Sequence, residues 1–225
     1  MKVESKSCVV VVGRDVAGTI HQVIDALPSG IPVVFVDDGS LDGSSEGLPE
    51  HVFVVRHEHS RGYGGAQKSG YNWAVERGFE QVALLHGDDQ YNADDVLGLL
   101  DALDVADIAL GSRFLAYEGG YVIPWWRRWA NRGLTGFANR ILGTEMTDGH
   151  TGARAYRASL LRRLSFESFS DNYLFDQQLI AASARLGVTF GERPVRTRYD
   201  DDVQSISWTK SVQYGLGCVL ELVRG

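Results

Sequence analysis

The hydrophobic residues in the first half of the chain fall into short runs separated by polar, glycine-containing stretches. Five such runs, most of them rich in valine, leucine or isoleucine, lie at residues 8–12, 32–36, 52–55, 82–85 and 108–110. They are continuous rather than alternating, which is typical of strands covered on both faces. They are also shorter than an ordinary helix. The pattern therefore predicts five buried strands of a mostly parallel sheet.

Between and after these runs, apolar residues recur at helical spacing. The predicted helices lie at residues 19–27, from the glycine cluster at 62–65 to about 74, from the expected cap Asn92 to 103, and at 175–186 and 208–223, with one more strand at 188–190. Strands that alternate with helices predict an α/β fold, a Rossmann-like sheet flanked by helices. The length of 225 residues fits a single domain, with the last helix as a C-terminal appendage.

Composition narrows the class of protein. The chain is 44% hydrophobic and 23% charged, with a net charge of −7, so we expect a globular protein that does not bind nucleic acid. Its two cysteines lie near opposite ends, which favours a reducing compartment over a disulfide framework. No signal peptide is visible at the N-terminus, and no apolar stretch reaches the length of a membrane span. We expect a cytoplasmic enzyme.

Arginine is concentrated in one stretch of the second half. Residues 113–163 contain nine arginines, three acidic residues and no lysine. Arginine suits bidentate contact with phosphate oxygens, so this stretch predicts an anion-binding region. The alternative is a set of solvated helix faces.

Polar clusters follow three of the predicted strands. They are Asp37–Asp38, His86–Gly87–Asp88 and Gly111–Ser112–Arg113. Ligands of parallel sheets bind beyond the carboxyl ends of the strands, so we expect the three clusters to face one crevice. Carboxylates without a neighbouring lysine need a cation or hydrogen-bond donors, and Asp88 is the preferred ligand for Mg²⁺. A contribution from His86 would favour Mn²⁺. The alternative is that residues 89–91 form only a turn and a helix cap.

A nicotinamide-binding Rossmann domain is a weaker interpretation. The turn after the first strand, residues 13–18, lacks the G-x-G-x-x-G spacing that a dinucleotide pyrophosphate requires. The glycine cluster at 62–65 precedes a helix, but it follows the third strand.

Six motifs, taken in order, resemble those of family 2 of the glycosyltransferases. They are the segments at residues 36–44, 61–66, 86–91, 111–113, 148–154 and 175–178. The resemblance runs from about residue 8 to residue 215. Within the family the chain is most similar to polyprenyl-phosphate sugar transferases of the dolichyl-phosphate mannose synthase type.

The resemblance implies a GT-A fold and inverting transfer of a hexose from a UDP- or GDP-linked donor, with Mg²⁺ or Mn²⁺ as cofactor. Residues 1–112 would form the half that binds the nucleotide sugar and residues 113–225 the acceptor side. Asp37 and Asp38 match the pair that meets the nucleoside, and Gly64 belongs to the donor-binding glycine loop.

The resemblance also assigns the reacting groups. The metal ligands would be His86, Asp88 and Gln90. Arg113 matches the arginine that holds the donor phosphate, and Arg127 the next one. Asp148 and Asp176 fall at acidic positions near the acceptor. The residues expected to take part in catalysis are Asp88, Arg113, Asp148 and Asp176.

The chain also departs from the family pattern. The first loop lacks the usual proline and N-E pair, because Val12, Asp15 and Val16 stand there. His86 replaces the first acid of the D-x-D motif. Residues 200–202 are three consecutive aspartates, which we interpret as a solvated loop near the acceptor. The alternative is a further role in metal binding or acceptor selectivity.

The acceptor stays open at this point. A phosphate monoester, with a second pKa of about 6, arrives mostly ionised and needs little help from a base. A hydroxyl acceptor would need one, and Asp148 or Asp176 is the candidate. Three hypotheses follow: transfer to a polyprenyl phosphate, transfer to a soluble small molecule, or a sugar-nucleotide-binding relative without activity.

A lipid acceptor would also require peripheral contact with the inner face of a membrane. The tryptophans 125, 126 and 129 with the arginines 127 and 128, and one apolar face of the last helix, are the interfacial candidates. Ordinary packing is the alternative for both.

Overall fold

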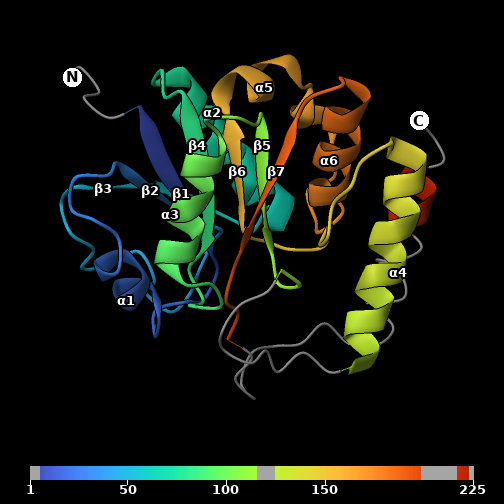
Figure 1. The fold of residues 1–225 in the computed structure, drawn as a ribbon. Helices are drawn as coiled ribbons and strands as arrows, with labels where there is room; N and C mark the ends of the chain where they lie inside the picture. Colours follow the sequence, from blue (N-terminus) through green and yellow to red (C-terminus); the bar gives the residue numbers. More distant parts are fainter. Residues whose placement is uncertain (1–5, 116–124, 199–216, 223–225) are drawn as a thin grey trace.

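The computed structural model describes residues 6–115, 125–198 and 217–222, with the backbone alone for 125–127. Its centre is a seven-stranded sheet with the strand order β3-β2-β1-β4-β6-β5-β7 (Figure 1). The strands are β1 (Ser7–Gly13), β2 (Val33–Asp37), β3 (Val52–Arg56), β4 (Gln81–His86), β5 (Ile108–Ser112), β6 (Arg154–Arg157) and β7 (Phe190–Pro194). The five strands expected in the first half are all present. The predicted mostly parallel α/β sheet is therefore confirmed.

One strand runs against the others and was not predicted. β6 pairs antiparallel with both β4 and β5, whereas the remaining pairs are parallel. Its sequence, Arg-Ala-Tyr-Arg, lacks the apolar run of a buried strand, yet Arg154 is completely buried. The strand expected at residues 188–190 was placed too early, because β7 begins at Phe190.

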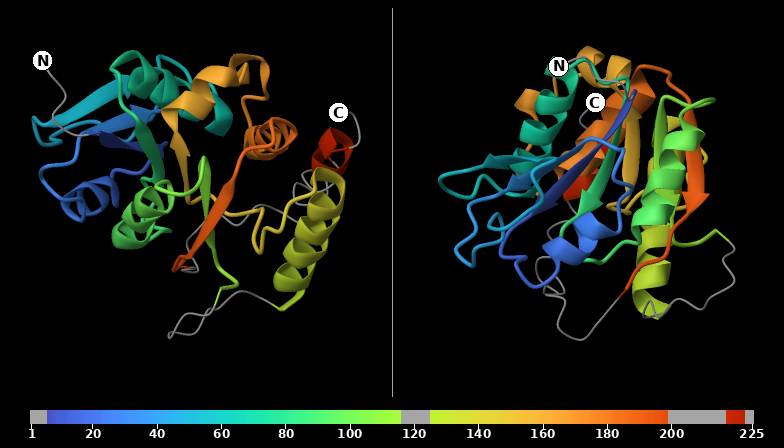
Figure 2. Two further views of the ribbon diagram at one scale, coloured as in Figure 1. Left: turned by 45° about the horizontal axis from the view of Figure 1, so that its top comes forward. Right: turned by 90° about the vertical axis from the view of Figure 1, so that its left-hand side faces the viewer.

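Helices cover both faces of the sheet (Figure 2). They are α1 (Ile20–Asp25), α2 (Tyr63–Glu76), α3 (Ala93–Ala102), α4 (Trp125–Leu142), α5 (Ala158–Arg163) and α6 (Phe175–Arg185), with a 3₁₀ turn at Phe166–Ser168. One apolar core lies between the sheet and α2, α5 and α6, and a second lies under α1 and α3. Asn92 caps α3 as expected, because its Oδ1 accepts hydrogen bonds from the amides of Asp94 and Asp95.

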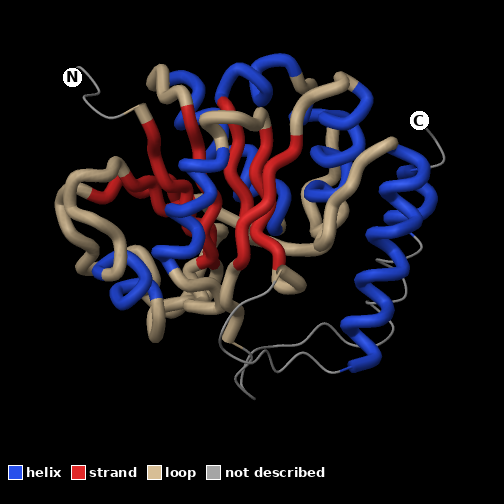
Figure 3. Tube along the Cα trace, viewed as in Figure 1, coloured by secondary structure: helices blue, strands red, loops and turns tan. Residues whose placement is uncertain are grey.

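The parallel strands all end at the same edge of the sheet, the lower edge in Figure 1. The strands and the loops that follow them are distinguished by colour in Figure 3. Helix α4 starts near this edge and runs alongside the sheet next to α6. Of the helix predicted at 208–223, the described part, residues 217–222, is helical. Among the described helices, none is long and apolar enough to cross a membrane.

Candidate functional site

The loops that follow β1 and β2 are joined by side-chain hydrogen bonds. The amide of Asp15 donates to Ser40 Oγ at 2.9 Å, and Asp15 Oδ1 accepts from the amide of Leu41 at 2.9 Å. The amide of Val16 donates to Ser44 Oγ at 2.8 Å. Asp15 adopts a positive φ of 54°, which aspartate tolerates better than most residues. The unusual first loop is thus held by the second loop.

Asp38 organises the turn that leads into α2. Its carboxylate accepts hydrogen bonds from His57 Nδ1 at 2.6 Å, Ser60 Oγ at 2.7 Å, and the amides of Arg61 and Gly62 at 2.7 and 2.9 Å. Burial alone would raise the pKa of Asp38, but these four bonds outweigh it and hold the pKa below its usual value. Asp38 is therefore an ionised anchor for the glycine loop.

Asp37 is enclosed by protein. Its Oδ1 accepts from the amide of Ser40 at 2.8 Å, and its Oδ2 lies 3.6 Å from Arg56 Nε without a hydrogen bond. The Asp37 side chain is inaccessible to solvent, whereas that of Arg56 is 51% exposed. Arg56 is therefore the member of this pair that a ligand at the sheet edge can reach.

The glycine loop packs against the second half of the chain. Gly62 has a φ of 87°, and a Cβ there would collide with the carbonyl oxygen of Asp171. The amide of Gly64 donates to the same oxygen at 2.8 Å. A Cβ at Gly64 would lie 2.5 Å from the carbonyl oxygen of Ser170. The loop, including Gly64, thus packs directly against the backbone of residues 170–172, and its glycines allow this close approach.

His86, at the end of β4, is held in one orientation by a hydrogen-bonded chain. Tyr63 Oη lies 3.0 Å from His86 Nε2 and donates to Asp176 Oδ2 at 3.2 Å. Tyr63 Oη uses its own proton in the hydrogen bond to Asp176, so it accepts the hydrogen bond from His86. We therefore assign the Nε2–H tautomer to His86, with the lone pair on Nδ1. Burial lowers the pKa of His86, which keeps the ring neutral. Behind the ring, a Cβ on Gly152 would lie 2.5 Å from His86 Cε1.

Asp88 projects from the loop after β4. It is exposed, and its Oδ1 accepts from the amide of Gln90 at 3.0 Å. The loop is attached at both ends, by Thr19 Oγ1 donating to the carbonyl of Gly87 and by the amide of Arg198 donating to that of Gln90. Asp88 therefore has an accessible carboxylate on an anchored loop.

These residues fit a divalent ion, although the described residues contain no cluster of three acidic, histidine or cysteine ligands. One accessible carboxylate is what a Mg²⁺ or Mn²⁺ ion needs from a protein when substrate phosphates supply further oxygens. The Tyr63–Asp176 support behind His86 matches the way a ligating histidine donates its other N–H to a second group. Asp88 and His86 Nδ1 are the atoms suited to the ion, and Gln90 lies in the same loop.

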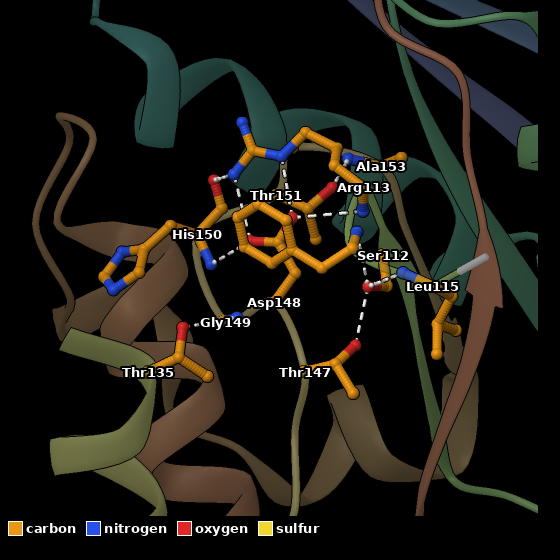
Figure 4. Close-up of polar contacts among 12 residues, drawn as sticks. Ser112, Arg113, Leu115, Thr135, Thr147, Asp148, Gly149, His150, Thr151 and Ala153 are labelled. Atoms are coloured by element: carbon orange, nitrogen blue, oxygen red, sulfur yellow. Dashed lines mark hydrogen bonds and ion pairs between the residues drawn. The ribbon is translucent and has the colours of Figure 1, made fainter. Parts of the chain in front are cut away.

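Arg113 and Asp148 form a buried bidentate pair (Figure 4). Arg113 Nε donates to Asp148 Oδ2 at 2.7 Å and Arg113 Nη2 to Oδ1 at 2.9 Å. The amides of Arg113 and His150 donate to the same carboxylate at 3.2 Å each. Burial alone would raise the pKa of Asp148, but the Arg113 charge and these bonds lower it. Both carboxylate oxygens are therefore occupied, and Asp148 is poorly placed to take a proton.

Asp176 is equally engaged. In the first turn of α6, its Oδ1 accepts from Gln67 Nε2 at 2.9 Å, and its Oδ2 lies 3.4 Å from the buried guanidinium of Arg154. Together with the Tyr63 bond described above, these contacts connect α2, β6 and α6. Both acids expected near the acceptor thus pair with arginines within the protein.

The prediction from strand ends located part of this site and missed the rest. Arg56, Tyr63 and Arg154 were not singled out. Arg56 ends β3, so the rule applied to the other strands would have found it. Tyr63 and Arg154 act through partners distant in sequence, and no local pattern marks them. The side chain of Arg127 and residues 200–202 lie outside the described residues, so their predicted roles stay predictions.

Comparison with known proteins gives one family. The model of the family described as "Glycosyl transferase family 2" matches residues 10–165. An undecaprenyl-phosphate mannosyltransferase from Micrococcus luteus is 30% identical over 186 residues, which cover 79% of this chain and 75% of that protein. A polyprenol monophosphomannose synthase from Mycolicibacterium smegmatis is 29% identical over 191 residues, 80% of this chain and 70% of that protein.

Solved structures agree on the fold. Glucosyl-3-phosphoglycerate synthase from Mycobacterium tuberculosis, in complex with Mn²⁺, UDP and glucosyl-3-phosphoglycerate, superimposes with a TM-score of 0.69. The match covers 99% of this chain and 80% of that one at 17% identity, a likeness that speaks for the fold alone.

Proposed function

Because this chain belongs to glycosyl transferase family 2 and has the GT-A fold, we propose that it transfers a sugar from a nucleoside-diphosphate sugar to a polyprenyl phosphate with inversion. It is a glycosyltransferase, and the acceptor is the part that needs an argument. The relatives from Micrococcus luteus and Mycolicibacterium smegmatis carry names that specify polyprenyl-type acceptors. That similarity extends over most of both chains and supports the same acceptor class here.

One observation carries the proposal: both acids expected near the acceptor already have partners within the protein. Both oxygens of Asp148 are held by Arg113, and Asp176 accepts from Gln67 and Tyr63 beside Arg154. A hydroxyl acceptor must lose its proton to a base as it attacks, whereas a phosphate monoester with a second pKa of about 6 arrives ionised. A site whose acids are already paired suits a phosphate acceptor.

We propose that the donor lies across the lower edge of the sheet. The nucleoside would lie beside the Asp37–Arg56 pair, at the end of β2 and β3, where Arg56 is accessible. Asp88 and His86 Nδ1 would hold the divalent ion, with Gln90 as a further ligand. When bound, that ion neutralises charge on the diphosphate as it leaves. Arg127 keeps its predicted phosphate-binding role at this donor site, whereas the guanidinium of Arg113 is already paired with Asp148.

In the proposed reaction the chain's own residues position the reacting groups. A phosphate oxygen of the acceptor attacks the anomeric carbon from the face opposite the diphosphate, and the bond from that carbon to the diphosphate oxygen breaks. The electron pair of the breaking bond leaves with the nucleoside diphosphate. The Asp38 anchor keeps the glycine loop in position, and the Tyr63–Asp176 chain keeps His86 in one tautomer. No proton transfer from the acceptor is required.

Transfer to a soluble acceptor is the second candidate. The fold neighbour from Mycobacterium tuberculosis was solved with glucosyl-3-phosphoglycerate, a soluble phosphorylated molecule. Its identity of 17% carries no substrate to this chain, so this candidate serves as an arm of the test.

The test is product formation from a matrix of donors and acceptors. Purified protein is incubated with UDP- and GDP-linked hexoses, a short water-soluble polyprenyl phosphate or 3-phosphoglycerate, and Mn²⁺, Mg²⁺ or EDTA. Mass spectrometry should show the polyprenyl phosphate plus one hexose, only with metal, and NMR should show an inverted anomeric centre. Hexosylated phosphoglycerate, with none of the lipid product, would replace the proposal with the second candidate.

A further inference from the structure

Helix α4 carries a row of exposed apolar side chains on its outer side. Trp129, Phe137 and Ile141 are 69%, 40% and 41% exposed. At 3.6 residues per turn, their spacing of eight and four residues places them within about 120° of one another around the helix axis. The opposite side is packed, because Thr135 and Ala138 are buried, and Ala138 belongs to the core that also contains Leu222. Large exposed apolar rows of this kind are a feature of interaction surfaces.

A second row on the same helix is basic. Arg128, Arg132 and Arg140 are exposed, and the whole of Trp125–Leu142 contains no acidic residue. The protein as a whole has a net charge of −7, so this helix is a local positive surface on an acidic molecule. We call Trp129, Phe137 and Ile141 with Arg128, Arg132 and Arg140 the α4 outer face.

The position of the α4 outer face connects it with the proposed acceptor. Helix α4 starts near the edge where the parallel strands end, and its other end lies far from that edge (Figure 1). The guanidinium of Arg132 lies 5.1 Å from the centre of the ring of Phe114, the residue that directly follows Arg113 in the chain. The face therefore extends from the proposed reaction site along the outside of the molecule.

We propose that the α4 outer face docks on an anionic lipid bilayer, with Trp129, Phe137 and Ile141 inserted at the headgroup boundary and Arg128 and Arg140 on lipid phosphates. Tryptophan and arginine side chains suit this boundary, because each combines an apolar body with a polar end. A second copy of the chain packed through the same face is a poor occupant, since it would bring arginines against arginines. The choice of a bilayer over another partner rests on the proposed function, which places the acceptor's chain in a membrane.

The first test is flotation with vesicles, which does not depend on activity. The protein should float with vesicles of phosphatidylcholine and phosphatidylglycerol and remain behind with phosphatidylcholine alone. Each arginine near an anionic surface contributes about 5-fold to binding, so replacing both Arg128 and Arg140 by glutamine should weaken vesicle binding about 25-fold. The variant with Trp129→Ser, Phe137→Ser and Ile141→Ser should lose at least about 10-fold.

Matched controls exclude general effects of the substitutions. Val54, Val105 and Leu186 are apolar and 43%, 85% and 41% exposed on other elements, so their triple serine variant should float like the wild type. The double variant Arg162→Gln and Arg163→Gln, at the end of α5, is the matched charge control. Circular dichroism and thermal unfolding of each variant show that the fold is kept.

Each outcome decides the inference. Loss of flotation in the α4 variants with the controls unchanged supports it. The inference is overturned if the wild-type protein does not float with anionic vesicles. It is also overturned if the α4 variants and the controls lose flotation equally. Transfer to a short, soluble polyprenyl phosphate should stay unchanged in the α4 variants, while transfer to a long-chain acceptor in vesicles falls with flotation. If the soluble acceptor is also inert with the wild type, the proposed function has failed independently of the surface.

Discussion

Two carboxylates at the proposed donor edge of the sheet, Asp38 and Asp88, have different partners from the two on the proposed acceptor side. At the donor edge, Asp38 is satisfied mostly by amides and a hydroxyl, and Asp88 remains exposed. On the acceptor side, Asp148 and Asp176 lie against the guanidinium groups of Arg113 and Arg154. Neutral donors leave the negative charge in place, whereas an arginine cancels it.

This difference gives the two regions opposite affinities. A region that keeps its negative charge attracts a cation, and a region whose acids are neutralised and whose arginines are in excess attracts anions. In the proposed function a metal-bound diphosphate would lie between the two. In the proposed reaction the ionised acceptor phosphate would approach from the side where Asp148 and Asp176 are both paired with arginines.

The largest effect should come from breaking the acceptor-side pair. Arg113→Met leaves the buried Asp148 carboxylate without its cation, and removing one partner of a buried pair costs about 3–5 kcal/mol. Urea unfolding should show this loss of unfolding free energy. The double variant with Asp148→Asn should recover part of it. A loss below about 1 kcal/mol, the range of a surface pair, would mean that Asp148 is not held by Arg113 as described.

The next effect tests the donor edge. Asp88→Asn removes the one accessible carboxylate of the proposed metal site, and we expect kcat/KM in Mn²⁺ to fall at least about 100-fold. Asp89→Asn is the control, because Asp89 pairs with Arg198 and asparagine tolerates its φ of 56°. Equal activity in wild type and Asp88→Asn would show that the proposed ion does not bind at Asp88.

Lowering the pH should destabilise the folded protein through His150, which lies on the proposed acceptor side. Burial lowers the pKa of His150, next to Asp148, to about 4, below about 6.5 in the unfolded chain. Between these values the unfolded state binds a proton that the folded state does not, so stability is lost as the pH falls from about 6.5 to 4, by no more than about 3 kcal/mol. His150→Gln should flatten this decline in urea unfolding. An unchanged pH dependence would place the acid-sensitive group elsewhere.

The smallest effect concerns the link between the two regions. Tyr63→Phe removes the hydroxyl between His86 and Asp176, and loss of such support should weaken Mn²⁺ binding about 10-fold. Tyr173 stacks on Tyr63 with ring centres 5.1 Å apart, and Tyr173→Phe is the control for the ring pair. Titration calorimetry with Mn²⁺ and UDP or GDP measures both. Unaltered affinity in Tyr63→Phe would argue against His86 as a ligand.

The sequence was informative where structure is local. The run at residues 8–12 predicts a buried strand because every side chain in it is apolar, and Asn92 predicts a helix start through its own side chain. Strand β6 escaped prediction because its buried Arg154 becomes tolerable only beside the carbonyl of Thr151 and the carboxylate of Asp176. A strand whose charge is satisfied by another part of the fold has no local signature.

The same reason limits the prediction of the site. Single residues such as Asp88 could be proposed because strand ends face one edge. The pairing of Arg113 with Asp148 spans 35 positions and turns an expected base into an arginine partner. Which acids are free is a property of the folded network, and residue types alone do not reveal it.

The central claim is the proposal that this site accepts an ionised phosphate, because Asp148 and Asp176, the acids expected near the acceptor, are already paired with arginines. The direct measurement is the ratio of kcat/KM for a polyprenyl phosphate to that for the polyprenol of the same chain length, with the same donor and metal. We expect transfer to the phosphate and none detectable to the alcohol, across the range from pH 6.5 to 8. Comparable rates for the two acceptors, rising with pH for the alcohol, would contradict the account.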